Sequence, residues 1–427
     1  MLLVAIVFTI LLVIGMPIAF AVGISGVVFF LQNPDLPRTM TVQLTVTETQ
    51  NFALLAVPLF ILAGNFLNSS GIAHNLLKLA SVLTGRLQGG LAQVSIALST
   101  LMSGVTGSSI ADAAMNTRLL GFEMLKRGFS KGYAAGVLSY GSLMAPIIPP
   151  GIGFILYGTV GQVSIGRLFA AGIIPGFMLW AALAVTISIT ARKHGYKPEL
   201  DRAPTPSEVF KASIAGSWAI LFPIILIFGL RFGVFTPSEI GAFAVVYAFL
   251  VGVFAYRMLT WTSFKQAVEA SLIDVGAVMF LLALSAVFGY GIIFERIPEV
   301  ISTWMLGITD DPTIVMVIIV LFILVAGTFM EGSVLIVMLT PIFMPLIQQY
   351  GIDPVHFGLV FIIAATIGNY TPPVGGAMFV VCQILRCPIE DYARESMPFL
   401  IAVSLVTLLL IFMPGIVLYM PNLLFNP

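Results

Sequence analysis

Charged residues are scarce in this chain. Only 9% of its 427 residues are Asp, Glu, Lys or Arg, whereas 59% are apolar, and the mean hydropathy is +1.08. A soluble domain carries about 25% charged residues. The composition therefore excludes a mostly water-exposed surface and favours a lipid-exposed one. The long apolar runs are continuous rather than alternating, which predicts membrane-spanning helices of about 20 residues and not a β-barrel.

Cysteine and histidine are also rare. Cys382 and Cys387 lack the spacing of a metal site or of a disulfide framework, and we interpret them as small apolar residues. His74, His194 and His356 lie far apart, which disfavours a catalytic triad or a metal cluster built on histidine. No P-loop occurs, so ATP is not the energy source within this chain. With a net charge of zero, no nucleic-acid partner is implied. We expect no enzyme activity and no organic cofactor.

The apolar runs predict nine membrane crossings. The first run, MLLVAIVFTILLVIGMPIAF, has no basic leader and no obvious cleavage site, so we interpret it as a span and not as a removed signal peptide. The expected crossings are 2–31, 52–68, 133–160, 167–191, 213–231, 238–256, 269–293, 355–382 and 395–421.

Two further apolar stretches, 89–124 and 313–348, are interrupted by glycine-rich polar segments. The interruptions are SGVTGSS at 103–109 and GTFMEGS at 327–333. Each half is about 14–17 residues long, which is short for a crossing. We therefore predict two re-entrant helical hairpins, each entering and leaving on one side of the membrane.

The basic residues are consistent with this topology. With a cytoplasmic N-terminus, nine crossings place the C-terminus outside, and fifteen of the nineteen Lys and Arg residues fall in inside loops. The four outside are Arg38, Arg167, Arg231 and Arg296. Cytoplasmic loops carry such an excess of positive charge. Treating either interruption as a true crossing would reverse every later segment and remove the bias.

The chain contains an internal repeat with an offset of 223 residues. Pro149-Pro150 recurs as Pro372-Pro373, Gly128 as Gly351, Pro175 as Pro398 and Gly104 as Gly327. Each copy has a span, a short arm segment (70–86 or 296–308), a hairpin, a span broken by Pro-Pro and a final span. Each copy crosses an odd number of times, so the two are inverted. Inverted repeats with discontinuous helices are typical of secondary transporters.

We therefore predict an all-α polytopic membrane protein with two inverted repeats, each with a re-entrant hairpin and a broken transmembrane helix. Residues 1–51 are expected to form an N-terminal span and a periplasmic connector, and 192–268 a cytoplasmic linker, polar at 192–212, with two additional spans. Repeat 1 is 52–191, with hairpin 89–124, broken helix 133–160 and final span 167–191. Repeat 2 is 269–427, with hairpin 313–348, broken helix 355–382 and a final span.

The hairpin tips and the Pro-Pro segments carry the candidate chemistry. Proline breaks helical hydrogen bonding, which frees carbonyls in APIIPPGIG (145–153) and GNYTPPVGG (368–376). Sodium, a hard cation like calcium, prefers several oxygen ligands. The predicted Na⁺ ligands are Ser103, Gly104, Ser108, Ala145 and Pro146 at one site, and Gly327, Gly332, Gly368 and Thr371 at its symmetry mate. The alternative is that these hydroxyls only bond to carbonyls of their own helices.

The second half of each hairpin begins at its tip. Free N–H groups and the helix dipole favour an anion at such a helix start. Two helix starts that face one cavity would bind a carboxylate without a buried arginine. The residues that we expect at the substrate are Ser108, Ser109, Pro150, Gly151, Ser333, Asn369, Thr371 and Pro372.

Two acids also lie at the tips, Asp112 and Glu331. Acids within membrane segments are functional candidates. However, Ser109-x-x-Asp112 and Thr328-x-x-Glu331 both match the capping-box pattern, which favours a capping role. The alternative role is a ligand for a proton or a cation.

These segments resemble the large membrane subunit of tripartite ATP-independent periplasmic (TRAP) transporters. The resemblance rests on MSGVTGSSIADAAMN (102–116), MAPIIPPGIGFILYG (144–158), AGTFMEGSVLIVMLTPIFMPL (326–346) and IGNYTPPVGGAMFVV (367–381). It extends over essentially the whole chain, including AVPLFILAGNFL at 56–67.

The resemblance implies a specific function, which the residue pattern alone does not imply. It implies sodium-driven import of a small carboxylate, such as a sialic acid or a C4-dicarboxylate, across a bacterial inner membrane. It also implies two partners, a small four-helix membrane subunit and a soluble periplasmic binding protein. The implied fold is of the ion-transporter type, and the implied mechanism is an elevator. In it, hairpins and broken helices slide against a scaffold that includes 52–68, 167–191, 269–293 and 395–421.

Other functions are still open at this point. One is a self-sufficient sodium–dicarboxylate symporter of the same architecture, and another is an ion channel. An intramembrane enzyme is disfavoured, since no nucleophile and base fall together on adjacent spans.

Overall fold

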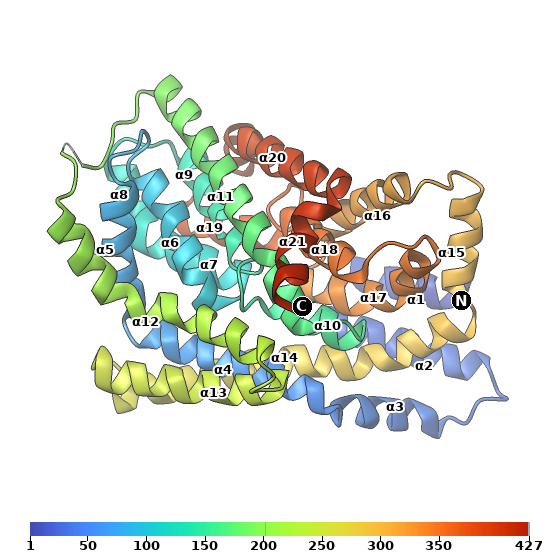
Figure 1. Ribbon diagram of the computed structural model, residues 1–427. Helices are drawn as coiled ribbons and strands as arrows, with labels where there is room; N and C mark the ends of the chain where they lie inside the picture. Colours follow the sequence, from blue (N-terminus) through green and yellow to red (C-terminus); the bar gives the residue numbers. More distant parts are fainter. Residues whose placement is uncertain (201, 426–427) are drawn as a thin grey trace.

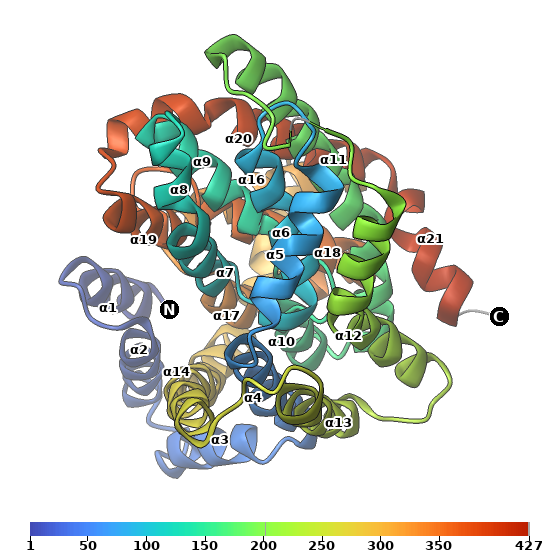
Figure 2. The same cartoon turned by 90° about the vertical axis from the view of Figure 1, so that its left-hand side faces the viewer.

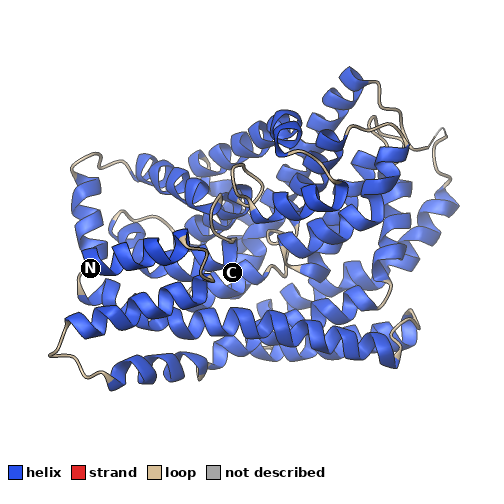
Figure 3. Ribbon diagram, turned by 180° about the vertical axis from the view of Figure 1, so that it is seen from behind, coloured by secondary structure: helices blue, strands red, loops and turns tan. Residues whose placement is uncertain are grey.

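All regular elements of the described residues are helices (Figures 1 and 3). The computed structural model describes residues 1–200 and 202–425. Within this part, seven helices are long and apolar enough to cross a membrane. They are Phe52–Ser69, Ile165–His194, Pro206–Arg231, Pro237–Ala255, Trp261–Phe294, Gly332–Gln349 and Ile389–Phe412. The predicted all-α polytopic class is confirmed.

The helices of the first repeat follow the predicted order. They are α4 (Ala56–Ser69, preceded by a 3-10 turn at Phe52–Leu55), α5 (Ile72–Thr84), α6 (Leu91–Thr106), α7 (Ser109–Asn116), a π-helical turn (Thr117–Gly121), α8 (Phe122–Lys126), α9 (Lys131–Gly141), a 3-10 turn (Ser142–Met144), α10 (Ile152–Val160) and α11 (Ile165–His194). Helices α12 (Pro206–Arg231) and α13 (Pro237–Leu250, followed by a π-helical turn at Val251–Ala255) come next.

The second repeat has the same order of elements. It consists of α14 (Trp261–Phe294), α15 (Ile297–Leu306), α16 (Pro312–Gly327), α17 (Gly332–Gln349), α18 (Pro354–Gly368), α19 (Gly376–Leu385), α20 (Ile389–Phe412) and α21 (Pro414–Phe425). Helices α7 and α17 start 223 residues apart, and so do α9 and α18. Gly128 and Gly351 both adopt positive φ, and both Pro-Pro bonds are cis. The predicted internal repeat is therefore present in the backbone.

Both interrupted stretches fold back on themselves as hairpins. In the second, the Tyr350 hydroxyl after α17 donates to the carbonyl oxygen of Thr309 before α16 (3.2 Å), so both ends of the hairpin lie together. In the first, Gln88 donates to the Tyr196 carbonyl (2.6 Å), and the Ser130 N–H donates to the Tyr196 hydroxyl (3.0 Å). Each stretch therefore turns back at its tip, although α17, at 18 residues, is longer than predicted.

The helix starts have local causes in the sequence. Thr205 with Glu208, and Thr236 with Glu239, form complete capping boxes at the starts of α12 and α13. Asp353 accepts the N–H of Val355 (2.7 Å) at the start of α18. The linker between α11 and α12 is 195–205, shorter than the predicted 192–212, and Asp201 within it lies outside the described residues.

The predicted single crossing at 2–31 is wrong. Residues 2–32 form two helices, α1 (Leu2–Val13) and α2 (Ile18–Gln32), and α3 (Thr39–Thr49) follows them. Gly15 has φ +81°, which lets the chain turn back, and Pro17 cannot continue the first helix. Met1 packs in one cluster with Phe29, Phe30 and Leu36.

The N-terminus therefore lies at the same end of the molecule as the loop after α2, beside α15 in Figure 1, and not at the end with most basic loops. The predicted cytoplasmic N-terminus, on the side of the basic loops, does not agree with this arrangement, because α1 and α2 fold back on each other. The count of basic residues is unaffected, because the first of them is Arg38.

The last predicted crossing, 395–421, is also divided. Helix α20 ends at Phe412, and α21 begins at Pro414 after a bend at Met413 (φ −124°, ψ 69°). Arg167 at the start of α11 donates to Asn422 of α21 (3.3 Å), so α21 packs against α11. The N-terminus and the end of α21 lie on opposite sides of the molecule in Figure 2.

Helices α4, α13 and α14 run side by side along one edge of the molecule (Figures 1 and 2). Small residues permit this packing: a Cβ on Gly241 of α13 would lie 3.0 Å from Leu59 Cβ of α4. Helix α4 also contacts the first hairpin, where a Cβ on Gly64 would lie 2.7 Å from the carbonyl oxygen of Val105. This layer forms one wall of the cavity described next.

Candidate functional site

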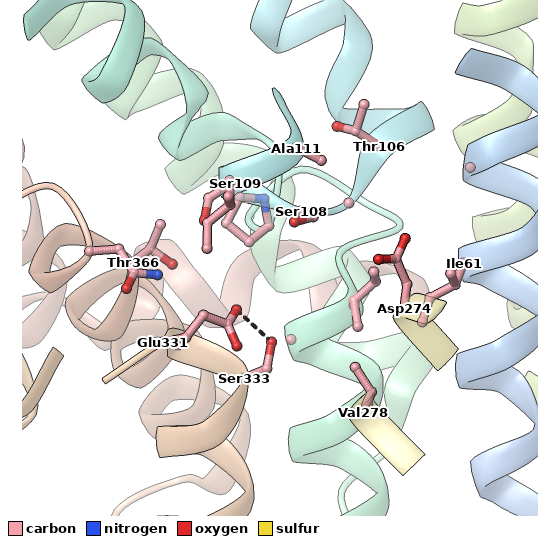
Figure 4. Close-up of a pocket in the computed structure, with 18 of the residues that line it drawn as sticks. Ile61, Thr106, Ser108, Ser109, Ala111, Asp274, Val278, Glu331, Ser333 and Thr366 are labelled. Atoms are coloured by element: carbon pink, nitrogen blue, oxygen red, sulfur yellow. Dashed lines mark hydrogen bonds between the residues drawn. The ribbon is translucent and has the colours of Figure 1, made fainter. Parts of the chain in front are cut away.

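Both hairpin tips and one broken helix of each repeat line a single cavity of about 540 Å³ (Figure 4). Residues 106–111 and 331–333 come from the tips, Pro146, Ile152, Gly153, Ile362, Thr366 and Asn369 from the broken helices, and Asn65, Asn68, Asp274, Ala277 and Val278 from α4 and α14. The two tips therefore converge on one space, as the inverted repeat predicts.

The first tip is a two-residue turn between α6 and α7. Gly107 ends α6 in the left-handed region (φ +57°), and the extended residue Ser108 precedes α7. The Ile152 N–H donates to the Gly107 carbonyl oxygen at 3.4 Å, and a Cβ on Gly107 would lie 2.8 Å from the Pro150 carbonyl oxygen. Glycine is required here by both its conformation and this close approach. The tip is thereby fixed to the first Pro-Pro segment.

The second tip is fixed by a close approach of two backbones. A Cβ on Gly368 would lie 2.5 Å from the Gly327 Cα, so α16 and α18 touch where both are glycine. Helix α17 begins at Gly332, which lies beside Asn369. A Cβ added at position 332 would lie 3.6 Å from the Asn369 Nδ2. Asn369 is almost fully buried, and its Oδ1 has no hydrogen-bond partner among the described residues, although it lines the cavity.

The structure brings only part of the predicted ligand set to the cavity. Ser108, Ser109, Pro146, Gly332, Ser333 and Asn369 line it. Ser103, Gly104, Ala145, Pro150, Gly151, Gly327, Gly368, Thr371 and Pro372 are not among the lining residues. The Ser103 hydroxyl donates to the Thr100 carbonyl (2.6 Å) and the Thr371 hydroxyl to the Ile367 carbonyl (2.9 Å), so these two hydroxyls bond back to their own helices.

Neither predicted capping box at the tips forms. Asp112 is fully buried within the first hairpin, where it accepts from Ser99 (2.6 Å) and Asn116 (3.0 Å). Because Ser99 lies on α6 and Asp112 on α7, this contact joins the two arms of the hairpin. Ser108, and not Ser109, precedes α7, and no side chain caps that helix.

Glu331 has a different environment from Asp112. It immediately precedes α17 and lines the cavity, and the Ser333 hydroxyl donates to its Oε1 at 2.9 Å (Figure 4). The Thr328 hydroxyl donates to the Val325 carbonyl instead of capping α17. Glu331 thus lines the cavity, whereas Asp112 is not among the lining residues and instead joins the two arms of the first hairpin.

The wall opposite the tips was not predicted from the sequence. Asp274 of α14 and Asn65 and Asn68 of α4 line the cavity, and Asn65 donates to Ser271 (3.0 Å) and Asp274 (3.4 Å). An acid within the apolar run SLIDVGAVMF was the signal that could have identified Asp274. The two amides carried no comparable signal, because a single Asn in a helix is common.

The cavity has no basic side chain among its lining residues. It holds two carboxylates, Asp274 and Glu331, and no ion pair among the described residues includes either of them. The N–H groups at the starts of α7 and α17 give it partial positive character.

Comparison with known proteins identifies the family. The family model described as "Tripartite ATP-independent periplasmic transporter, DctM component" matches residues 5–416. The chain belongs to this family. It is 33% identical over 407 residues to the 2,3-diketo-L-gulonate TRAP transporter large permease protein of Escherichia coli (strain K12), with 95% of each chain covered.

A second relative of this DctM-family chain is the C4-dicarboxylate TRAP transporter large permease protein of Vibrio cholerae, which is 30% identical with 98% of this chain and 96% of that protein covered. In fold, the chain is similar to the Alcanivorax borkumensis YdaH transporter, whose crystal structure has what is described as an unusual topology (TM-score 0.65, 16% identity, 87% of each chain). The DctM-family chain is therefore a multi-pass membrane protein of a transporter family, and the relatives are named as permeases rather than as enzymes.

Proposed function

We propose that this chain imports a small organic anion by sodium-coupled transport, after delivery by a periplasmic binding protein. The observation that supports the proposal is the cavity in which both hairpin tips meet. Helix α7 starts there without a side-chain cap, so its first N–H groups are free to bind a carboxylate. Helix α17 also starts there, with the Glu331 carboxylate beside its first turn. The names of the relatives, permeases for a sugar acid and for C4-dicarboxylates, agree with an organic acid.

The charge of the cavity supports coupling to a cation. Asp274 and Glu331 line it without a basic partner, so an entering carboxylate meets two like charges. A bound cation removes this repulsion, and a site that binds cation and anion together couples their transport. The oxygens available to sodium are the hydroxyls of Ser108 and Ser109, the Asn369 Oδ1 and the carbonyls of the broken helices.

The remaining parts of the proposal concern partners, orientation and motion. The partners are a small membrane subunit and a soluble binding protein, as the tripartite family description implies. We place the basic loops in the cytoplasm of a bacterial inner membrane. The motion is an elevator in which hairpins and broken helices slide against α4 and α14, which form the opposite wall of the cavity.

The test is uptake into proteoliposomes that contain the chain and its small membrane subunit. Binding proteins loaded with radiolabelled carboxylates are added outside, under an inward sodium gradient. We expect saturable uptake that stops when potassium replaces sodium and when the binding protein is omitted. Uptake that persists in potassium contradicts sodium coupling.

The same assay separates the alternatives. Sodium-dependent uptake without the binding protein and without the small subunit would identify a self-sufficient symporter. Ion current in planar bilayers without any organic acid would identify a channel. The family match disfavours both, because the family description is that of a tripartite system.

A further inference from the structure

The wall opposite the hairpin tips is chemically unlike the tips. The tip side offers the N–H groups at the uncapped start of α7 and the hydroxyl of Ser108, which suit a carboxylate. At the start of α17, the Ser333 hydroxyl already donates to Glu331. The opposite side, from α4 and α14, offers Asn65, Asn68 and Asp274. Figure 4 shows Asp274 across the space from Glu331 and Ser333. A bound molecule therefore meets the anion-binding start of α7 on one side and Asp274 on the other, and Glu331 of the second tip lies across the space from Asp274.

Asp274 is available to a ligand. Its side chain is exposed in the cavity, its one recorded contact is the 3.4 Å hydrogen bond from Asn65, and no ion pair of the described residues includes it. A carboxylate accepts hydrogen bonds from hydroxyl groups and repels another carboxylate. The neighbouring amides of Asn65 and Asn68 can both donate to and accept from hydroxyls.

A second observation points to a polar ligand in the same space. Asn369 is 2% exposed, lines the cavity and has no partner for its Oδ1 among the described residues. A buried amide oxygen without a partner costs free energy unless a bound molecule or ion satisfies it. The volume of about 540 Å³ is in the range of sites for drug-sized ligands, roughly 300–1,000 Å³, and so accommodates more than a four-carbon acid.

We propose that the cavity selects a polyhydroxylated monocarboxylate over a dicarboxylate, and that Asp274 makes this choice. The single carboxylate binds at the hairpin tips, and hydroxyl groups at the other end donate to Asp274 and contact Asn65 and Asn68. A second carboxylate at that end would lie against Asp274. The inference rests on the proposed function, because it assumes that the tips bind the transported anion.

The test compares two probes that differ only in one group, D-gluconate and D-glucarate. Glucarate carries a second carboxylate where gluconate carries a hydroxymethyl group. The chain with its small membrane subunit is placed in nanodiscs in sodium buffer, and the shift of the thermal unfolding midpoint is measured against acid concentration to give an apparent Kd. We expect the wild type to bind gluconate about tenfold more tightly than glucarate, as one unfavourable charge contact predicts.

The variants then locate the cause of the preference. Asp274→Asn should bring the two Kd values within about twofold of each other, and Asp274→Glu should keep the preference. Glu269→Gln is the matched control: it removes one exposed charge from the same helix outside the cavity and should change nothing.

An unchanged ratio in Asp274→Asn, or an equal change in Glu269→Gln, overturns the inference. Equal or tighter binding of glucarate by the wild type does the same, and so does the absence of binding by both acids. The uptake assay reports separately on the proposed function. Sodium-dependent uptake of some carboxylate combined with any of these results leaves the function standing and removes only the selection by Asp274.

Discussion

Ser103 and Ser108 lie on either side of the first hairpin tip, but their hydroxyls differ in what they contact. Ser103 is fully buried in α6 and donates to the Thr100 carbonyl at 2.6 Å. Ser108 lines the cavity, precedes α7 and makes no capping hydrogen bond. Only Ser108 therefore has its hydroxyl directed to a cavity in which sodium and the anion are expected to bind.

Replacing Ser108 with Ala should raise the sodium concentration for half-maximal uptake by about three- to tenfold, because one oxygen ligand worth about 1 kcal/mol is lost. Ser103→Ala is the matched control and should change this concentration by less than about twofold, since its hydroxyl serves its own helix. The measurement is initial uptake against sodium concentration in proteoliposomes. Equal shifts in both variants would contradict the assignment of Ser108.

The residue types at the tips indicated the right region, but not which atoms would face the cavity. Serines and glycines near 103–109 and 327–333 were predicted from the sequence, and four of them line the cavity: Ser108, Ser109, Gly332 and Ser333. The rotamer that sends the Ser103 hydroxyl to Thr100 depends on helix geometry, which a residue pattern does not carry. Asp274 was missed because it comes from a helix distant in the sequence from both tips.

At the scale of the elements, two glycines decide how the second hairpin meets its broken helix. Gly327 and Gly368 are both within or at the end of helices, and neither has a positive φ. Both were predicted as sodium ligands, but neither is among the residues that line the cavity. Glycine is needed here because the backbones of α16 and α18 touch.

Gly368→Ala should therefore loosen this contact and impair transport. The added Cβ would lie 2.5 Å from Gly327 Cα and 2.9 Å from the Leu324 carbonyl oxygen, and relief of such overpacking costs about 1–3 kcal/mol. We expect a lower thermal unfolding midpoint in detergent and loss of uptake. Gly276→Ala in α14 is the control, because no atom lies within 4 Å of its added Cβ. Equal stability of the two variants would contradict the role of the contact.

The hairpins could be predicted because their signals are local. Short apolar halves and a glycine-rich break indicated that each stretch turns back, and the bonds at the hairpin ends show that it does. The break between α1 and α2 is marked in the sequence by only two helix-breaking residues, Gly15 and Pro17. It was missed because the surrounding run is uniformly apolar and long enough for one crossing.

At the scale of the whole molecule, the α1–α2 pair changes which end holds the N-terminus. Met1 packs with Phe29, Phe30 and Leu36, so the chain begins near the loop that contains Asp35. The end of α11, with Arg192 and Lys193, and the loop after it, with Lys197, lie among the basic segments expected in the cytoplasm. The first residues and the α11 end should then lie on opposite sides of the membrane.

Single cysteines can test this arrangement with a membrane-impermeant maleimide. Leu2, Asp35 and Lys193 are exposed, whereas the native Cys382 and Cys387 are buried and provide a low background in the unmodified chain. We expect Leu2→Cys and Asp35→Cys to be labelled in intact spheroplasts, and Lys193→Cys only after permeabilisation. Labelling of Asp35→Cys from outside together with protection of Leu2→Cys would show that residues 2–31 cross once. Such a result would contradict the folded-back pair, whereas joint labelling places both ends of that pair in the periplasm.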